Sequence, residues 1–397
     1  MLYFELKKLL KRTPVWLLLL LTIGSSVGYF FYHVQQKNQR INDLQLAMNQ
    51  TIHATQEHMN YLLEQGTVEQ GQLDNMEYQL TLIEEQLAAI NGGPADYLTW
   101  FINDTELYAQ GHKGFALENR MVPSSLYAKT NEQLRQLQIN QIEPMQPLNY
   151  LTDFQQISSL LPEDILFLQQ ENQRFYEKSW YHLWHALANN HQIVLLLMIL
   201  LGIFASYAHE QKRTRKHLQF LWLEDYSPIQ VLLHNYLAKL FYWSVFSVLV
   251  VGAVIGLTAW INGLGDLRYP VPIDTFAPES STFIPLSSYL LRSLGIYIES
   301  SLFALSLGLL IESLLPHPVL AWLTQTIVLI SGIFFTPLNR WNPFSYFLTH
   351  KILTKNDPFS STIIRYQDSW ILLVFASCFV LSAYLIVKQR MRKKQFL

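Results

Sequence analysis

Apolar residues gather in six runs along this chain of 397 residues. Each run is close to the ~20 residues that a helix needs to cross a bilayer. The runs cover residues 15–32, 193–207, 241–261, 289–315, 319–336 and 370–387; the second and fifth are short and the fourth is long enough to tilt. The expected fold class is therefore mainly α: a six-helix transmembrane bundle with a large, helix-rich extracytoplasmic domain between spans one and two.

The stretch between the first two runs begins with a heptad pattern. One seam has apolar residues spaced alternately by three and four positions, at Leu73, Met76, Leu80, Ile83, Leu87 and Ile90. Val34, Ile41, Met48, Thr55 and Leu62 hold one heptad position upstream. Because Gly66 and Gly71 separate the two arms, we expect an antiparallel helical hairpin over residues 34–91. Residues 95–161 have a mixed pattern that predicts no fold, and a further helix is expected over residues 163–188.

Clusters of Lys and Arg indicate the orientation, because positively charged loops stay in the cytoplasm. The clusters precede the first span (Lys7, Lys8, Lys11, Arg12), follow the second (Lys212, Arg213, Arg215, Lys216) and follow the sixth (Lys388, Arg390, Arg392, Lys393, Lys394). Six spans with both termini cytoplasmic satisfy all three. The loop with Arg340, Lys351, Lys355 and Arg365 argues weakly against this arrangement. We expect a multi-pass protein of the cell membrane, with residues 33–190 and 262–288 outside.

Composition agrees with a membrane protein, since half of the residues are apolar and only 15% are charged. Residues 33–190 carry 8 Lys and Arg against 19 Asp and Glu, a net charge of −11, so nucleic-acid binding is not expected there.

The basic start and Gly24, Ser25 and Ser26 could mark a cleaved signal peptide, but the apolar run continues through Tyr32 and favours a retained span.

Cysteine and histidine give no metal site. Cys378 is the single cysteine, so no intramolecular disulfide can form. Because it lies in an apolar run, we expect it to fill space as a small apolar side chain. His182, His185 and His191 lie close together beside aromatic residues and could bind a metal. No carboxylate completes a ligand spacing, so packing at the membrane interface is favoured.

The connection between spans two and three is longer than a turn requires. Residues 209–230, called the elbow below, begin with the basic cluster and continue with Leu218, Leu221 and Trp222 at helical spacing. Ser227-Pro228-Ile229-Gln230 has the pattern of a capping box that starts the next helix. A basic amphipathic helix of this kind either lies on anionic lipid or docks a protein.

This connection resembles that of ABC-2 type permeases, with an acidic residue at the end of span two, a basic amphipathic helix, a turn with Pro-Ile and a helix with Lys entering span three. The matching residues are Glu210, Lys212, Arg213, Arg215, Lys216, Leu218, Leu221, Trp222, Pro228, Ile229 and Lys239. Glu5 to Leu10 and Asn342-Pro343-Phe344-Ser345-Tyr346 agree with the family as well. The chain departs from it at Arg213-Thr214-Arg215 and in the long insert after span one.

The resemblance implies four regions: residues 1–32 with span one; the external domain 33–190; 191–261 with span two, the elbow and span three; and 262–397 with spans four to six and a basic tail. It implies a permease subunit of an exporter for a lipid-like, peptide or drug substrate. The elbow is then the coupling helix for a separate ATP-binding subunit. A second permease protomer, homo- or heteromeric, and membrane lipids are the other partners.

No phosphate-binding loop, G-x-S-x-G or H-E-x-x-H motif occurs, so the chain is not expected to be an enzyme. It should need no cofactor itself, and ATP and Mg²⁺ would be bound by the partner. Arg292, Glu299 and Glu312 in the fourth run are candidates for function or for bundle packing. An ATP-driven mechanical or sensory protein, whose hairpin acts on the cell envelope without moving cargo, stays open, as does an ATP-independent scaffold.

Overall fold

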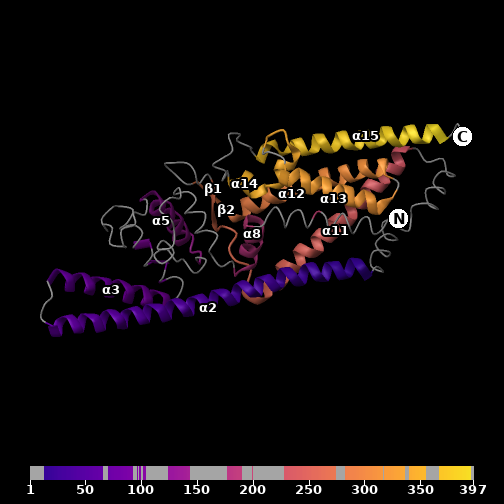
Figure 1. Cartoon of the computed structure of the whole chain (residues 1–397). Coiled ribbons are helices and arrows are strands. Elements are labelled where there is room, and N and C mark those ends of the chain that lie inside the picture. Colours follow the sequence, from indigo (N-terminus) through magenta and orange to yellow (C-terminus); the bar gives the residue numbers. More distant parts are fainter. Residues whose placement is uncertain are drawn as a thin grey trace. The chain divides into compact units, whose positions relative to one another are not determined.

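The computed structural model describes residues 13–65, 70–92, 124–143, 177–189, 228–273, 282–315, 317–335, 339–354 and 366–394, with single residues between 96 and 103 and at 199. The described part is mainly helical (Figure 1), as the sequence predicts. The chain divides into two compact units. The bundle unit comprises Met1–Gly28, Lys178–Gly265 and Ser287–Leu397, and the hairpin unit comprises Tyr29–Glu177 and Asp266–Leu286.

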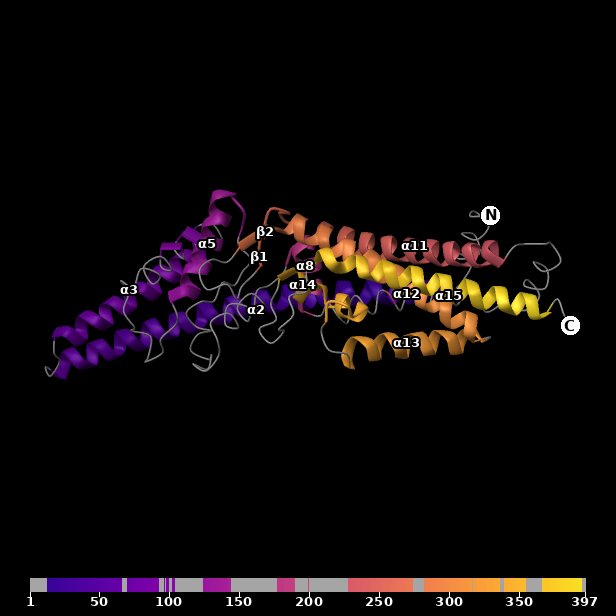
Figure 2. The same cartoon turned by 90° about the horizontal axis from the view of Figure 1, so that it is seen from above.

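The bundle unit is built around the long helices α11 (Pro228–Asn262), α12 (Leu286–Leu314), α13 (Pro318–Phe335) and α15 (Trp370–Lys394). Figure 2 shows α11 beside α15, which it contacts. By length and composition, three described segments can cross a membrane: Tyr236–Asn262, Leu286–Leu314 and Tyr366–Gln389. Val319–Phe335 is apolar but shorter. The run at 193–207 lies outside the described residues except for Ile199, so six spans stay a prediction.

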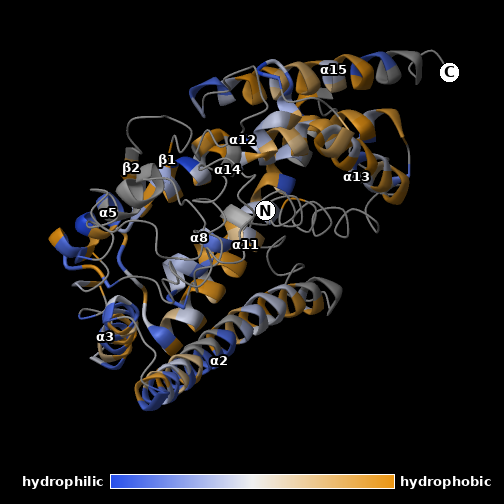
Figure 3. Cartoon of the chain, turned by 60° about the vertical axis from the view of Figure 1, so that its left-hand side comes forward, coloured by the Kyte–Doolittle hydropathy of each residue, from blue (hydrophilic) through white to orange (hydrophobic). Residues whose placement is uncertain are grey.

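These helices expose apolar side chains that a water-soluble protein would bury. Val248 and Trp260 of α11, Leu291 of α12, and Ile327 and Phe335 of α13 are all more than half exposed. Hydrophobic residues predominate along α13 and α15 in Figure 3. Exposed apolar surface of this extent is typical of contact with lipid or with a partner. Cys378 is exposed on α15, so it is not the buried filler that the sequence predicts.

Short elements complete the bundle unit: α8 (Ser179–Asn189), the 3₁₀ helices η2 (Pro343–Phe347) and η3 (Tyr366–Ser369), and α14 (Thr349–Thr354). The expectation of one helix over residues 163–188 is wrong at its middle, because Glu177 and Lys178 are not helical. Helix α8 starts at Ser179, and the backbone N–H groups of its first two residues, Ser179 and Trp180, donate to the carbonyls of Gly263 and Leu264. Gly265 lies at φ +82° in the same loop, and a Cβ there would crowd Tyr181.

The hairpin unit contains most of α2 (Thr13–Gln65), α3 (Gln70–Gly92), α5 (Ser124–Ile139) and a strand pair. The Gln45 amide donates to Asn91 Oδ1 at 3.0 Å, which joins α2 to α3. On α2, Met48 is buried, and on α3 the six seam residues from Leu73 to Ile90 are all half-buried. The predicted seam is therefore the less exposed side of α3.

The external loop predicted for residues 262–288 also contains two strands that the sequence did not predict. Strand β1 (Pro270–Ile273) pairs antiparallel with β2 (Thr282–Pro285), with Pro270 opposite Pro285 and Val271 opposite Ile284. The buried Gln133 of α5 donates from Nε2 to the Pro270 carbonyl at 3.1 Å. This bond attaches α5 to the strand pair.

Candidate functional site

The elbow residues expected to couple the chain to an ATPase fall outside the described part. These are Glu210, Lys212, Arg213, Arg215, Lys216, Leu218, Leu221 and Trp222. Pro228, the last residue of that set, is the first residue of α11. A Pro at the first helical position lacks only an N–H that would have no intrahelical partner there, which is why the helix can begin at this residue. Whatever the elbow contacts, α11 is the helix that continues from it.

The first half of α11 is joined to α12 by a buried ion pair. Lys239 Nζ of α11 contacts Glu312 Oε1 of α12, with side-chain exposures of 4% and 14%. Glu312 lies in the last turn of α12, whose final residue is Leu314. Removing one partner of such a pair leaves an uncompensated charge in a low-dielectric region. The pair therefore holds the start of α11 and the end of α12 in register.

Apolar packing surrounds this ion pair. Leu232 of α11, Leu309 of α12 and Ala383 of α15 form a buried cluster. Around it pack Tyr236 and Leu310, together with Val380, Tyr384 and Val387 of α15. The Ser306 hydroxyl donates to the Tyr236 hydroxyl at 3.3 Å, a second polar link between α11 and α12. Three helices thus meet where α11 begins, and a displacement of that end would act on all three.

The α11–α12 contact continues further along both helices. The Trp243 ring lies 5.4 Å from the Tyr297 ring, and the Tyr297 hydroxyl is 2.9 Å from Ser247 Oγ. Helix α13 is joined to α12 differently, since the fully buried Gln325 donates from Nε2 to the Ala304 carbonyl at 2.6 Å. Polar side chains that are satisfied across helices in this way fix register within an apolar bundle.

The Asn-Pro-Phe-Ser-Tyr segment after α13 forms the 3₁₀ helix η2. Asn342 is its N-cap, and its Oδ1 accepts from the Phe344 N–H at 3.1 Å. Ser345 Oγ accepts from the Asn339 N–H, and the Tyr346 hydroxyl donates to the Arg340 carbonyl at 2.9 Å. Each polar residue of the motif satisfies a backbone group of the turn, so non-helical backbone can pack against apolar helices.

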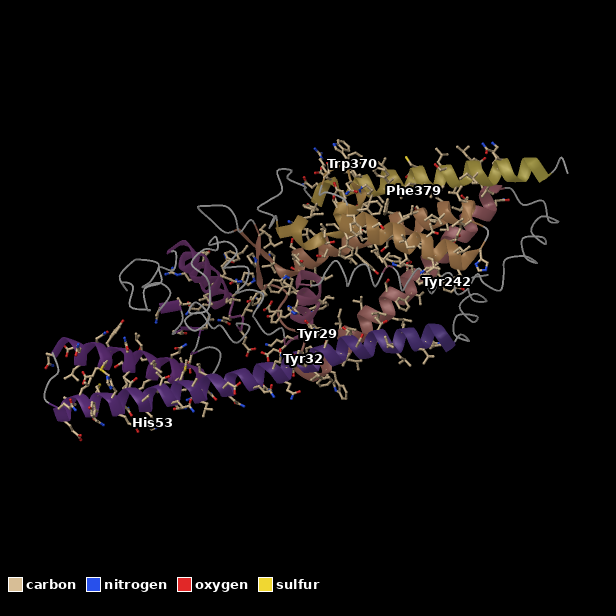
Figure 4. All side chains as sticks on the ribbon, viewed as in Figure 1. Tyr29, Tyr32, His53, Tyr242, Trp370 and Phe379 are labelled. Atoms are coloured by element: carbon tan, nitrogen blue, oxygen red, sulfur yellow. The ribbon has the colours of Figure 1, made fainter. Side chains whose placement is uncertain are left out.

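Phenylalanines attach η2 to the bundle. The Phe303 ring of α12 lies 5.5 Å from Phe344, 6.3 Å from Phe347 and 5.6 Å from Phe379 of α15, which Figure 4 labels. A Cβ on Gly332 of α13 would overlap the Phe344 ring. These four rings, Phe303, Phe344, Phe347 and Phe379, are called the phenylalanine cluster below. The absence of a side chain at Gly332 allows the cluster to form.

Charged groups accompany this cluster. Arg340 donates to the buried Asp368 of η3 at 2.8 Å, and Arg292 of α12 lies over the Tyr366 ring of η3, 4.9 Å from its centroid. Several of these charges affect the pKa of the Tyr346 phenol. Burial raises the pKa of Tyr346 to about 12; Asp368 and Glu299 also raise it, whereas Arg340 lowers it.

The three intramembrane candidates have three different environments. Glu312 is paired with Lys239, Arg292 is stacked on Tyr366, and Glu299 Oε2 is buried with no hydrogen-bond partner among the described residues. Of the two roles expected for these residues, function or bundle packing, the ion pair of Glu312 agrees with bundle packing. Its partner Lys239 was a matching residue of the family but not a predicted site, and nothing local predicts a pairing across 73 positions. Asp368 and Arg340 were likewise not predicted as a pair.

Two of the three histidines considered for a metal, His182 and His185, lie in the described part, and His191 lies outside it. His182 and His185 of α8 are both buried. Within the described residues, no group of three or more His, Cys, Asp or Glu is arranged to hold a metal. Nearby, Trp184 packs edge-to-face on Tyr289 of α12 at 6.4 Å.

Compared with known proteins, the chain matches no family model, no curated protein and no solved structure. The resemblance to ABC-2 permeases therefore rests on the residues of the sequence alone.

Proposed function

We propose that this chain is the transmembrane permease subunit of an ATP-driven ABC-2 type exporter in the cell membrane. It spans the membrane six times with both termini cytoplasmic, pairs with a second permease protomer, and moves a lipid-like, peptide or drug substrate outward. A separate ABC ATP-binding subunit docks on the elbow and hydrolyses ATP with Mg²⁺. The chain itself catalyses no reaction.

The buried Lys239–Glu312 pair carries this proposal. A helix that only crossed the membrane would not need an ion pair in its first half, because burying two charges is costly. The pair joins the helix that follows the elbow to α12, and Leu232 and Tyr236 join it to α15 through the apolar cluster. A push on the elbow would thus be passed to three helices at once. This is what coupling to an external ATPase requires.

A second candidate is a mechanical or sensory protein in which ATP hydrolysis moves the hairpin without any cargo. The length of α2, which continues from Thr13 to Gln65 without a break, favours it. Both candidates need the ATPase. Reconstitution of the complex in proteoliposomes separates the two candidates. A permease moves a solute across the bilayer when ATP is added, whereas a mechanical or sensory protein moves none.

The ATPase itself is tested by affinity purification of the tagged chain from its native membrane in mild detergent. The wild type should bring down a protein with a phosphate-binding loop, and the variant Glu210→Ala/Arg213→Ala/Arg215→Ala should lose it. A matched variant, Lys388→Ala/Arg392→Ala/Lys393→Ala, removes charges from the tail and should keep the subunit. If no ATPase accompanies the wild type at low ionic strength, the proposal fails.

A further inference from the structure

Of the three intramembrane candidates, Glu299 of α12 has neither an ion pair nor a ring contact among the described residues. Its Oε2 is buried without a hydrogen-bond partner among the described residues, although the side chain as a whole is partly exposed. The residue lies within the Leu286–Leu314 segment that is long and apolar enough to span a membrane. A carboxylate in such a segment is costly to ionise unless a cation approaches it. Its partial exposure leaves one side open to such an approach.

Three described cations of the bundle unit contact groups other than Glu299. Lys239 contacts Glu312, and Arg340 contacts Asp368. Arg292 lies seven residues before Glu299 on the same face of α12, yet its guanidinium stacks on the Tyr366 ring. In the described part of the bundle unit, Glu312 and Asp368 form ion pairs with Lys239 and Arg340, whereas Glu299 forms none.

The phenylalanine cluster begins one helical turn after Glu299, at the fully buried Phe303. Phe303 contacts the other three rings of the cluster. Phe344 and Phe379 are themselves partly exposed. Aromatic rings offer apolar contact and attract cations through their negative faces. A carboxylate one helical turn from such a cluster matches a molecule that is both cationic and apolar, and it disfavours an anion of the same shape.

We propose that Glu299 is the counter-charge for a cationic amphipathic substrate whose apolar body lies on the phenylalanine cluster. This inference rests on the proposed export function and names its substrate class. Charge selectivity comes from the Glu299 carboxylate, and apolar affinity comes from Phe344 and Phe379. Substitution of Glu299 should therefore change which charge is preferred, whereas substitution of Phe344 should weaken the binding of either charge.

Two ions of nearly identical shape and opposite charge test whether Glu299 determines which charge the chain prefers to bind. Binding of tetraphenylphosphonium and tetraphenylborate to the purified full-length chain is measured by equilibrium dialysis. The wild type should prefer the cation, and Glu299→Gln should lose at least about tenfold in affinity for the cation while its affinity for the anion is kept or increased. Glu299→Asp should retain the preference in part. The exposed Glu85→Gln, in α3, is the matched control for charge and should bind as the wild type does.

The outcomes that overturn the inference are equally definite. If Glu299→Gln binds the cation as tightly as the wild type, or loses both ions equally, Glu299 is not the counter-charge. The same preparations are probed for the co-purifying ATPase. If the ATPase co-purifies but the preference for the cation does not depend on Glu299, only the inference about Glu299 fails and the exporter proposal stands. A Glu299-dependent preference in a chain that brings down no ATPase refutes the exporter and leaves a cation-binding site.

Discussion

Lys239 of α11 and Glu312 of α12 form an ion pair in which the lysine side chain is 4% exposed and the glutamate side chain 14% exposed. Breaking it by Lys239→Met should cost about 3–5 kcal/mol of stability, because the carboxylate is left buried and uncompensated. The double variant Lys239→Met/Glu312→Leu should recover most of this loss. Thermal unfolding of the detergent-solubilised chain measures both effects.

The matched control for this prediction is a pair on the surface. Arg268 and Asp266 contact each other at 2.6 Å, and the Arg268 side chain is exposed. Arg268→Ala should leave the melting temperature nearly unchanged, since water and salt screen exposed pairs. A single variant at Lys239 that is as stable as Arg268→Ala would show that the buried pair does not hold α11 to α12.

Gly332 of α13 should tolerate no side chain. A Cβ there would overlap the Phe344 ring, so Gly332→Ala must displace η2 and should cost about 1–3 kcal/mol. Gly295 of α12 has nothing within 4 Å of the corresponding position, and Gly295→Ala should be neutral or slightly stabilising. Melting temperatures of the two variants check this. Equal effects would mean that Phe344 does not pack on Gly332.

Tyr346 should make the stability of the fold sensitive to alkaline pH. Its pKa is about 12 when folded, above the ordinary value of 10, mainly through burial. Below pH 10 the phenol is neutral in both states and its contribution is complete. Between pH 10 and about 12 only the unfolded state loses the proton, so the free energy of unfolding falls. The advantage of wild type over Tyr346→Phe should therefore shrink across this window, and an unchanged difference would contradict it.

The orientation of the chain can be tested with single cysteines. In a Cys378→Ser background, Tyr61→Cys at an exposed position of α2 should react with a membrane-impermeant maleimide on intact cells. Gln389→Cys, which is exposed near the end of α15, should react only after the membrane is opened. The opposite pattern would refute the topology in which both termini are cytoplasmic.

Local features of the sequence predict where several described helices begin or end, but they do not predict α5, which lies in the stretch whose pattern predicts no fold. Helix α11 begins at Pro228 and α13 at Pro318, because Pro is favoured at a first helical position. Gly92, the last residue of α3, directly follows the range 34–91 expected for the hairpin. The exposed position of Cys378 was not predicted, because an apolar run does not reveal which of its sides faces outward in the bundle.

Long-range pairing could not be predicted from local pattern. Nothing in the sequence around Lys239 identifies Glu312 as its partner, and nothing around Arg292 identifies Tyr366. Strands β1 and β2 are short and rich in proline, so their alternation is too brief to distinguish from a loop. The start of α8 at Ser179 is bonded through backbone N–H groups to Gly263 and Leu264, which are likewise distant in the chain.

The proposal that the elbow docks an ATPase, and does not simply lie on lipid, is tested most directly by photo-crosslinking in native membranes. A photoreactive residue is placed in turn at Leu218, Leu221 and Trp222, with the exposed Leu381 of α15 as the control position. We expect adducts from the elbow to a protein that carries a phosphate-binding loop, and none to that protein from residue 381. Adducts to lipid alone at all three elbow positions would contradict the account.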